Sequence, residues 1–218
     1  MSKKEEKQKG AVLTAFIDTT LEKEAFPLSV FKFCKDNDIE EKFFYKHFGS
    51  LDAVKGQIWE FFYDNAMGLL EKDATFENAS PKDKLLSFYF TFFEVLLLNR
   101  SYVLFSLSSH QSNRVKMSQL SKMRSSFKDF AEDLIDTGNA NKNESYLQHP
   151  PKIFSEGAWI QFAFLMKFWI NDTSVDFEKT DQAIEKSVQT AFDLFDNTPL
   201  CTLVDFGKFL WKEKFVFN

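Results

Sequence analysis

Apolar residues recur every three to four positions along most of this chain of 218 residues, which is the spacing of helices with one buried face. Proline, serine and glycine residues and short polar stretches interrupt that spacing and mark where helices begin and end. The pattern predicts about ten helices, at 4–24, 27–36, 40–47, 51–73, 81–99, 102–109, 114–136, 151–170, 176–196 and 200–217. The polar stretch 138–149 is expected to be a loop.

Composition supports helices over sheets. Phenylalanine fills 28 positions, whereas the helix-breaking residues glycine and proline fill only 7 and 5. Many large apolar side chains with few breakers favour an all-α fold. Most of these rings are expected to fill the core, and the alternative is that some of them line a cavity for an apolar ligand.

The chain lacks the apolar stretches of a secreted or membrane-spanning protein. Its first nine residues are polar, and its two longest apolar segments, 85–98 and 157–170, are interrupted by Glu94 and Lys167. A membrane-spanning helix needs about 20 apolar residues, and a signal peptide needs an apolar centre. We therefore expect a cytoplasmic protein without a membrane span.

Three short helices, with a tight turn at 36–38 between the second and the third, describe a helix-turn-helix unit. The third helix and its end, 39–50, read IEEKFFYKHFGS. Residues 12–62 resemble the DNA-binding domain of TetR-type transcriptional repressors, in which this block usually reads VSKGTLYHHFGS. Five residues coincide at fixed spacing, namely Tyr45, His47, Phe48, Gly49 and Ser50. The segment 168–178 looks like the paired last helices of the same family.

This resemblance implies a TetR-like fold, with a three-helix helix-turn-helix head at 1–50 and a larger helical ligand-binding and dimerisation domain at 51–218. It implies a ligand-responsive transcriptional regulator that binds double-stranded DNA as a homodimer. The expected ligand is an apolar small molecule or lipid. Carried over position by position, the DNA contacts are Thr19, Ser29, Glu40, Glu41, Lys42, Phe43, Tyr45, Lys46 and His47.

The charge of the segment around the predicted helix-turn-helix unit opposes DNA binding. Residues 10–65 hold six lysines, no arginine and ten acids, which gives a net charge of −4. DNA affinity rests largely on the neutralisation of phosphates by lysine and arginine. Two alternatives therefore stand beside the regulator. One is a lipid- or isoprenoid-binding protein with a TetR-like fold that has lost DNA binding, and the other is a module whose head binds a basic protein.

The larger domain contains two aromatic helices whose side chains either line a pocket or close-pack a bundle. The predicted pocket residues are Phe88, Tyr89, Phe92, Phe93, Tyr102, His110, Phe127, Trp159, Gln161, Phe162 and Met166. The late helices at 151–170 and 176–196 are expected to pair with their copies across a two-fold axis. The predicted contacts there are Trp159, Phe162, Phe192 and Phe195.

Between 99 and 128 the chain holds six basic residues and no acid. These basic residues are expected to lie on a helix face that is exposed to solvent. The alternative is that they contact an anionic group. The sequence contains no dinucleotide or phosphate loop, no G-x-S-x-G and no H-E-x-x-H motif, and its three histidines lie far apart. We therefore expect no enzymatic activity, no catalytic residues, no metal and no cofactor.

Overall fold

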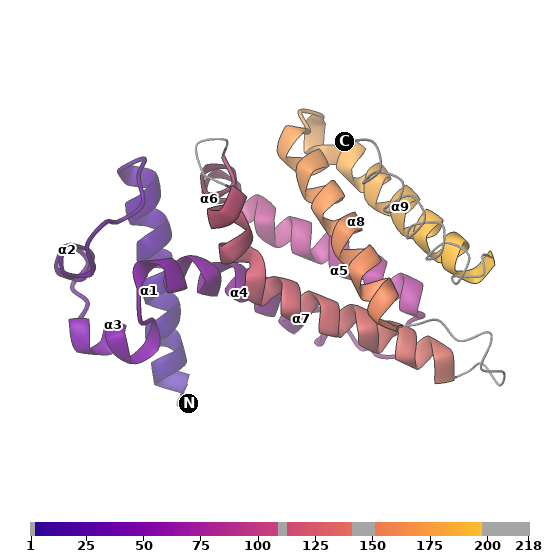
Figure 1. Cartoon of the computed structure of the whole chain (residues 1–218), viewed down its shortest axis with the longest axis horizontal. Coiled ribbons are helices and arrows are strands. Elements are labelled where there is room, and N and C mark those ends of the chain that lie inside the picture. Colours follow the sequence, from indigo (N-terminus) through magenta and orange to yellow (C-terminus); the bar gives the residue numbers. More distant parts are fainter. Residues whose placement is uncertain (1–2, 109–112, 141–150, 198–218) are drawn as a thin grey trace, which may run out of the picture. The chain divides into compact units, whose positions relative to one another are not determined.

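The computed structural model describes residues 3–108, 113–140 and 151–197 (Figure 1), and within these ranges it is helical without strands. The all-α fold expected from the hydrophobic pattern is therefore confirmed. The helices are α1 (Lys3–Glu22), α2 (Val30–Asp36), α3 (Glu41–His47), α4 (Leu51–Leu70), α5 (Pro81–Leu98), α6 (Arg100–Ser106), α7 (Asn113–Ala140), α8 (Pro151–Asn171) and α9 (Glu178–Asn197), with a 3₁₀ turn η2 (Val175–Phe177) before α9. The helix predicted at 200–217 lies outside the described residues.

Two helix boundaries differ from the predicted ones, each for a local reason. Helix α2 begins at Val30 and not at Pro27, because the extended Ser29 caps it and its hydroxyl accepts the N–H of Lys32 at 3.3 Å. Helix α7 runs on to Ala140 and takes the first residues of the stretch 138–149, which was predicted to be a loop.

Helices α5 and α6 are separated by a sharp bend at Asn99. Helix α5 ends at Leu98, and the side chain of the next residue, Asn99, donates to the carbonyl of Val95 at 2.9 Å. Among the described helices, none is by itself long and apolar enough to cross a membrane. Only α5 and α6 taken together meet that requirement, and they are bent by 90° relative to each other.

The chain divides into two compact units, each built from separate stretches of sequence. The first unit contains Met1–Lys72 and Thr91–Phe127, and the second contains Asp73–Phe90 and Lys128–Asn218. Both boundaries at 90/91 and 127/128 fall inside continuous helices, α5 and α7. The predicted division at residue 50 into a head and a larger domain remains a prediction.

Within the first unit, α1, α2 and α3 enclose a small core of phenylalanine rings. The centroids of Phe16 and Phe33 are 5.7 Å apart, those of Phe33 and Phe44 are 6.1 Å apart, and those of Phe44 and Phe48 are 5.5 Å apart. All four rings are buried. Since edge-to-face aromatic contacts are directional, this cluster holds α3 in one orientation on α1.

The head is joined to the rest of the first unit through α4 and α6, both of which pack against α1. Phe26, in the loop after α1, lies 6.1 Å from Phe16 and 5.1 Å from Phe105 of α6, measured between ring centroids. The ammonium of Lys55 on α4 sits 4.1 Å from the centre of the Phe26 ring. Phe26 therefore connects the core of the head to α4 and α6.

In the second unit, α8 and α9 lie side by side as an antiparallel pair (Figure 1). Gln161 of α8 donates to the hydroxyl of Ser187 on α9 at 2.9 Å, and the ring centroids of Phe154 and Phe192 are 5.5 Å apart. Tyr89 of α5 donates to the carbonyl of Ala158 at 3.2 Å. These contacts fix α8 between α5 and α9.

Asp172 organises the turn between α8 and α9. One carboxylate oxygen accepts the N–H and hydroxyl of Ser174, and the other accepts the N–H and hydroxyl of Thr180, at 2.7–2.9 Å. Hydrogen bonds to the charged form, first from Ser174 and then from Thr180, hold the pKa of Asp172 well below its usual range. The carboxylate thus caps the start of α9 from a preceding turn.

We expect Asp172→Ala to lower the thermal midpoint at pH 7 by several degrees, because four donors then lose their acceptor. A depressed native pKa stabilises the fold above the unfolded value, near pH 4, and that contribution is lost as the pH falls further. The gap between the wild type and the variant should therefore shrink in acid. Melting curves at pH 7 and pH 3 measure it, with the exposed Glu185→Ala as the control, and a gap that stays constant would contradict the assignment.

Candidate functional site

Helix α3 presents one polar face to solvent. Lys42, Tyr45 and Lys46, at relative positions i, i+3 and i+4, are exposed on the same side of the helix. Phe44 points the opposite way, into the core. Glu40 and Glu41, also exposed, flank this face at the beginning of α3. The face therefore combines two ammonium groups and a phenol with two carboxylates.

The other predicted DNA contacts lie partly inside the head. Thr19 is buried, and its hydroxyl accepts a hydrogen bond from the Asn37 amide at 3.2 Å, so that it braces α1 against the end of α2. The His47 ring is almost covered and lies 4.5 Å from the half-buried ring of Phe43. Ser29 is exposed at the beginning of α2. Thr19, Phe43 and His47 thus support the face that the exposed residues form.

Carboxylates offset several of the positive charges of the head. Lys46 pairs with Glu5 of α1, and Lys23 pairs with Asp36 at 2.9 Å. The hydrogen bond from Lys23 lowers the pKa of Asp36. Lys42 forms no ion pair with any residue in the described part of the chain.

The predicted pocket residues are divided between the two units. Phe92, Phe93, Tyr102 and Phe127 belong to the first unit, and Phe88, Tyr89, Trp159, Gln161, Phe162 and Met166 belong to the second. All of them are buried except Gln161, which is half-buried, and His110 lies outside the described residues.

The two buried tyrosines differ in their hydrogen bonding. The Tyr89 hydroxyl donates to the carbonyl of Ala158, so that it serves packing within the second unit. The Tyr102 hydroxyl has no hydrogen-bond partner among the described residues, although its side chain is fully buried. Burial raises the pKa of both phenols far above the usual value, so both are uncharged.

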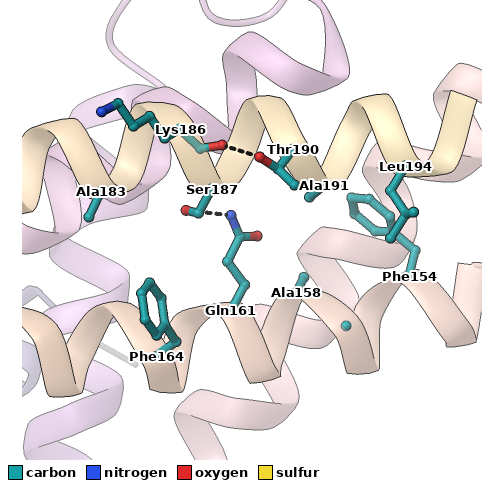
Figure 2. Close-up of a pocket in the computed structure, with 11 residues that line it drawn as sticks. Phe154, Ala158, Gln161, Phe164, Ala183, Lys186, Ser187, Thr190, Ala191 and Leu194 are labelled. Atoms are coloured by element: carbon teal, nitrogen blue, oxygen red, sulfur yellow. Dashed lines mark hydrogen bonds between the residues drawn. The ribbon is translucent and has the colours of Figure 1, made fainter.

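An apolar groove of about 580 Å³ lies between α8 and α9 (Figure 2). Phe154 and Leu194 border one end of it, Phe164 borders the other, and Gln161 crosses it to reach Ser187. Beyond the groove, the same pair of helices exposes Ile160. Ile160, Phe164 and Leu194 thus leave apolar side-chain area exposed on this helix pair.

Two of the four residues predicted for dimer contact are buried within their own unit. Trp159 and Phe162 are buried in the core of the second unit, where their rings stack with centroids 5.0 Å apart. Phe192 is half-buried against Phe154, and the side chain of Phe195 lies outside the described residues. The large apolar side chains that are exposed on α8 and α9 are Ile153, Ile160, Phe164 and Leu194.

The described residues were also compared with the requirements of a metal site. Among the described residues, no three histidine, cysteine or acidic side chains gather in a way that would hold a metal ion. The features that remain are the exposed polar face of α3 and the apolar groove between α8 and α9.

Residues 84–210 match the family model described as the tetracyclin repressor-like C-terminal domain. This match covers more than half of the chain and, with the all-α fold and its three-helix head, defines a protein of the TetR class. The chain belongs to the tetracyclin repressor-like family, whose members are regulators rather than enzymes. No curated protein matches the chain.

Proposed function

We propose that this protein is a ligand-responsive transcriptional regulator that binds double-stranded DNA as a homodimer. The observation that carries the proposal is the exposed face of α3, where Lys42, Tyr45 and Lys46 stand together above a rigid aromatic core. Lysine and tyrosine side chains are suitable donors to phosphate oxygens, and a recognition helix enters the major groove with such a face. Membership of the TetR family supports the same conclusion.

The mechanism that we propose is a shift between two populations of the dimer. DNA with two half-sites selects dimers whose heads have the matching separation. A ligand that binds better to dimers with another separation lowers the fraction able to bind DNA. Its effect is limited by the ratio of its affinities for the two states.

Fluorescence anisotropy tests the DNA proposal directly. The protein is titrated against a labelled duplex from upstream of its own gene and against a scrambled duplex of equal length, from ~50 to ~300 mM salt. We expect tighter binding to the upstream duplex, weakening steeply with salt. Lys42→Ala and Lys46→Ala should each reduce the salt slope by about one, whereas the exposed Lys72→Ala should leave it unchanged. Weak and equal binding to both duplexes would contradict the proposal.

The second candidate is a lipid-binding protein of the same fold that has lost DNA binding. Two observations favour it, namely the net charge of −4 over residues 10–65 and the pairing of Lys46 with Glu5 inside the head. Native mass spectrometry of the intact purified protein should then show a retained lipid. A ligand-free spectrum together with specific DNA binding would reject this candidate.

We also propose that the α8–α9 groove is the contact between two copies of the chain. Phe164 borders the groove and is 53% exposed, and Leu194 and Ile160 extend the apolar surface. Burial of apolar area against an identical surface is the usual basis of a two-fold homodimer.

Phe164→Glu is expected to weaken dimerisation by about 100-fold or more, because an uncompensated charge in an interface costs about 3 kcal/mol. Analytical ultracentrifugation at micromolar concentration measures the change. Leu69→Glu is a matched control, since Leu69 is also 53% exposed but lies on α4. If both variants remain dimers, the groove is not the interface.

A further inference from the structure

Helix α1 carries a carboxylate on the side that faces the core of the head. Val12 and Phe16 are buried, and they follow Glu5 by about two and three helical turns, so all three residues lie along nearly the same side of α1. The Glu5 side chain is accordingly only 24% exposed. The next residue, Glu6, lies about 100° further round the helix and is exposed.

The Glu5 carboxylate meets the last turn of α3. Its Oε1 atom accepts a hydrogen bond from the ammonium of Lys46 and lies 3.4 Å from Nε2 of His47. The His47 side chain is 8% exposed, whereas that of Lys46 is 66% exposed. Glu5 therefore contacts both basic residues of that turn, and Lys46 stays accessible to a further anion.

The two lysines on the exposed face of α3 differ in their electrostatic surroundings. Lys42 forms no ion pair with the described residues, whereas Lys46, about one turn later, already has a carboxylate partner. An ammonium group has three donors, so a phosphate could bind Lys46 beside Glu5. Two negative charges would then lie close together and repel each other. A phosphate at Lys46 must therefore displace Glu5 or be repelled by it.

We propose that Glu5 occupies Lys46 in the place of a DNA phosphate and thereby sets the affinity of the head for DNA. Glu5 is a positioning residue, because it acts through Lys46 and does not itself contact DNA. The inference rests on the DNA binding proposed above and goes beyond it, since it assigns part of the affinity of α3 to a residue of α1.

The strength of this contact limits the effect and makes it independent of DNA sequence. An ion pair with one exposed partner contributes little to stability, so DNA can displace Glu5 at low salt. Contacts with phosphate carry no sequence information. Glu5 should therefore lower the affinity for every duplex by the same factor and leave the preference for one duplex over another unchanged.

The first experiment tests the contact in the full-length protein without DNA. Nuclear magnetic resonance follows the side-chain nitrogen Nζ of Lys46, identified by its loss in Lys46→Ala. We expect Glu5→Gln to shift this resonance, because the charged acceptor is removed. Glu6→Gln makes the same change of charge at the adjacent exposed residue and should leave the resonance in place. Identical Nζ shifts in the wild type and Glu5→Gln would overturn the proposal.

Fluorescence anisotropy then measures the competition with DNA. At ~50 mM salt, Glu5→Gln should raise the affinity for both the upstream and the scrambled duplex by about three- to tenfold, because each head regains one ammonium. The gain should shrink as salt rises, and Glu6→Gln should change the affinity by less than about twofold. A gain confined to the upstream duplex, or an equal gain with Glu6→Gln, would overturn the proposal.

A double-mutant cycle tests whether Glu5 acts through Lys46. In the Lys46→Ala background, Glu5→Gln should raise the affinity by less than about twofold, since no ammonium remains for Glu5 to occupy. An undiminished gain would overturn the proposed role, because Glu5 would then repel DNA directly. Specific DNA binding that Glu5→Gln leaves unchanged would reject this inference alone. The absence of specific binding by the wild type and by every variant would reject the proposed regulator, and the competition with it.

Discussion

Replacement of Phe44 by alanine is expected to unfold the head and to abolish any binding by α3. Phe44 is fully buried and contacts the rings of Phe33, Tyr45 and Phe48 at centroid distances of 6.1, 5.6 and 5.5 Å. Deletion of a buried phenylalanine ring costs about 3–5 kcal/mol. Because α3 is only seven residues long, it cannot persist without this contact.

Chemical denaturation with circular dichroism as the signal measures the loss, provided that both variants show a single transition. Phe31→Ala is the matched control, because Phe31 lies in the same head but is 61% exposed. Its substitution should change the free energy of unfolding by about 0.5 kcal/mol or less. Equal effects of the two substitutions would show that the ring cluster does not hold α3 in place.

The second large effect is expected from the paired substitution Glu40→Ser with Glu41→Lys. It removes two carboxylates from the exposed beginning of α3 and adds one ammonium, which raises the net charge of residues 10–65 from −4 to −1. Less repulsion from phosphates and one more cationic contact should raise DNA affinity by about 10- to 100-fold at low salt, with the gain shrinking as salt rises.

Anisotropy titrations at several salt concentrations measure this gain. Glu71→Ser with Glu77→Lys makes the same change of charge at exposed positions outside the head and serves as the control. A gain in both double variants would indicate a general effect of net charge. No gain in either would mean that α3 does not meet DNA, and would favour the lipid-binding candidate.

The helices of this fold were predictable because their boundaries carry strong local signals. Ser50 caps α4 by accepting the N–H of Ala53 at 3.1 Å, and Pro81 and Pro151 begin α5 and α8 as expected. The match of Tyr45 through Ser50 identified the family, which the match over 84–210 confirms. Local chemistry and a short motif were sufficient for these conclusions.

The orientation of side chains on α8 was not predictable in the same way. Helix α8 is apolar on nearly every side, so helical periodicity does not identify its buried face. Trp159 and Phe162 were predicted to contact a second copy and are buried within their own unit, whereas Phe164 faces outward. That difference depends on which sides α5 and α9 cover, and these contacts join residues far apart in the chain.

Which buried polar side chains find a hydrogen-bond partner was equally unpredictable from the sequence. Tyr89 and Tyr102 both lie in apolar helical segments, and both seemed suitable to anchor a ligand. The structure distinguishes them. The Tyr89 hydroxyl donates a hydrogen bond to the carbonyl of Ala158, whereas the Tyr102 hydroxyl has no hydrogen-bond partner among the described residues. Nothing in the sequence indicated that Nε1 of Trp59 and Oε1 of Gln119 would be buried without a hydrogen-bond partner among the described residues.

The interleaving of the two units has a consequence for how such a protein can be recombined. Neither unit corresponds to one continuous stretch of the gene, since the chain passes from one to the other at 72/73, 90/91 and 127/128. A single crossover at any of these points would combine segments of one compact unit from two different parent proteins. Crossovers at 90/91 and 127/128 would also divide α5 or α7 between the two parents. Because α1 packs against α4 and α6, exchange of a functional head between relatives is expected to succeed only when both segments of the first unit are transferred together.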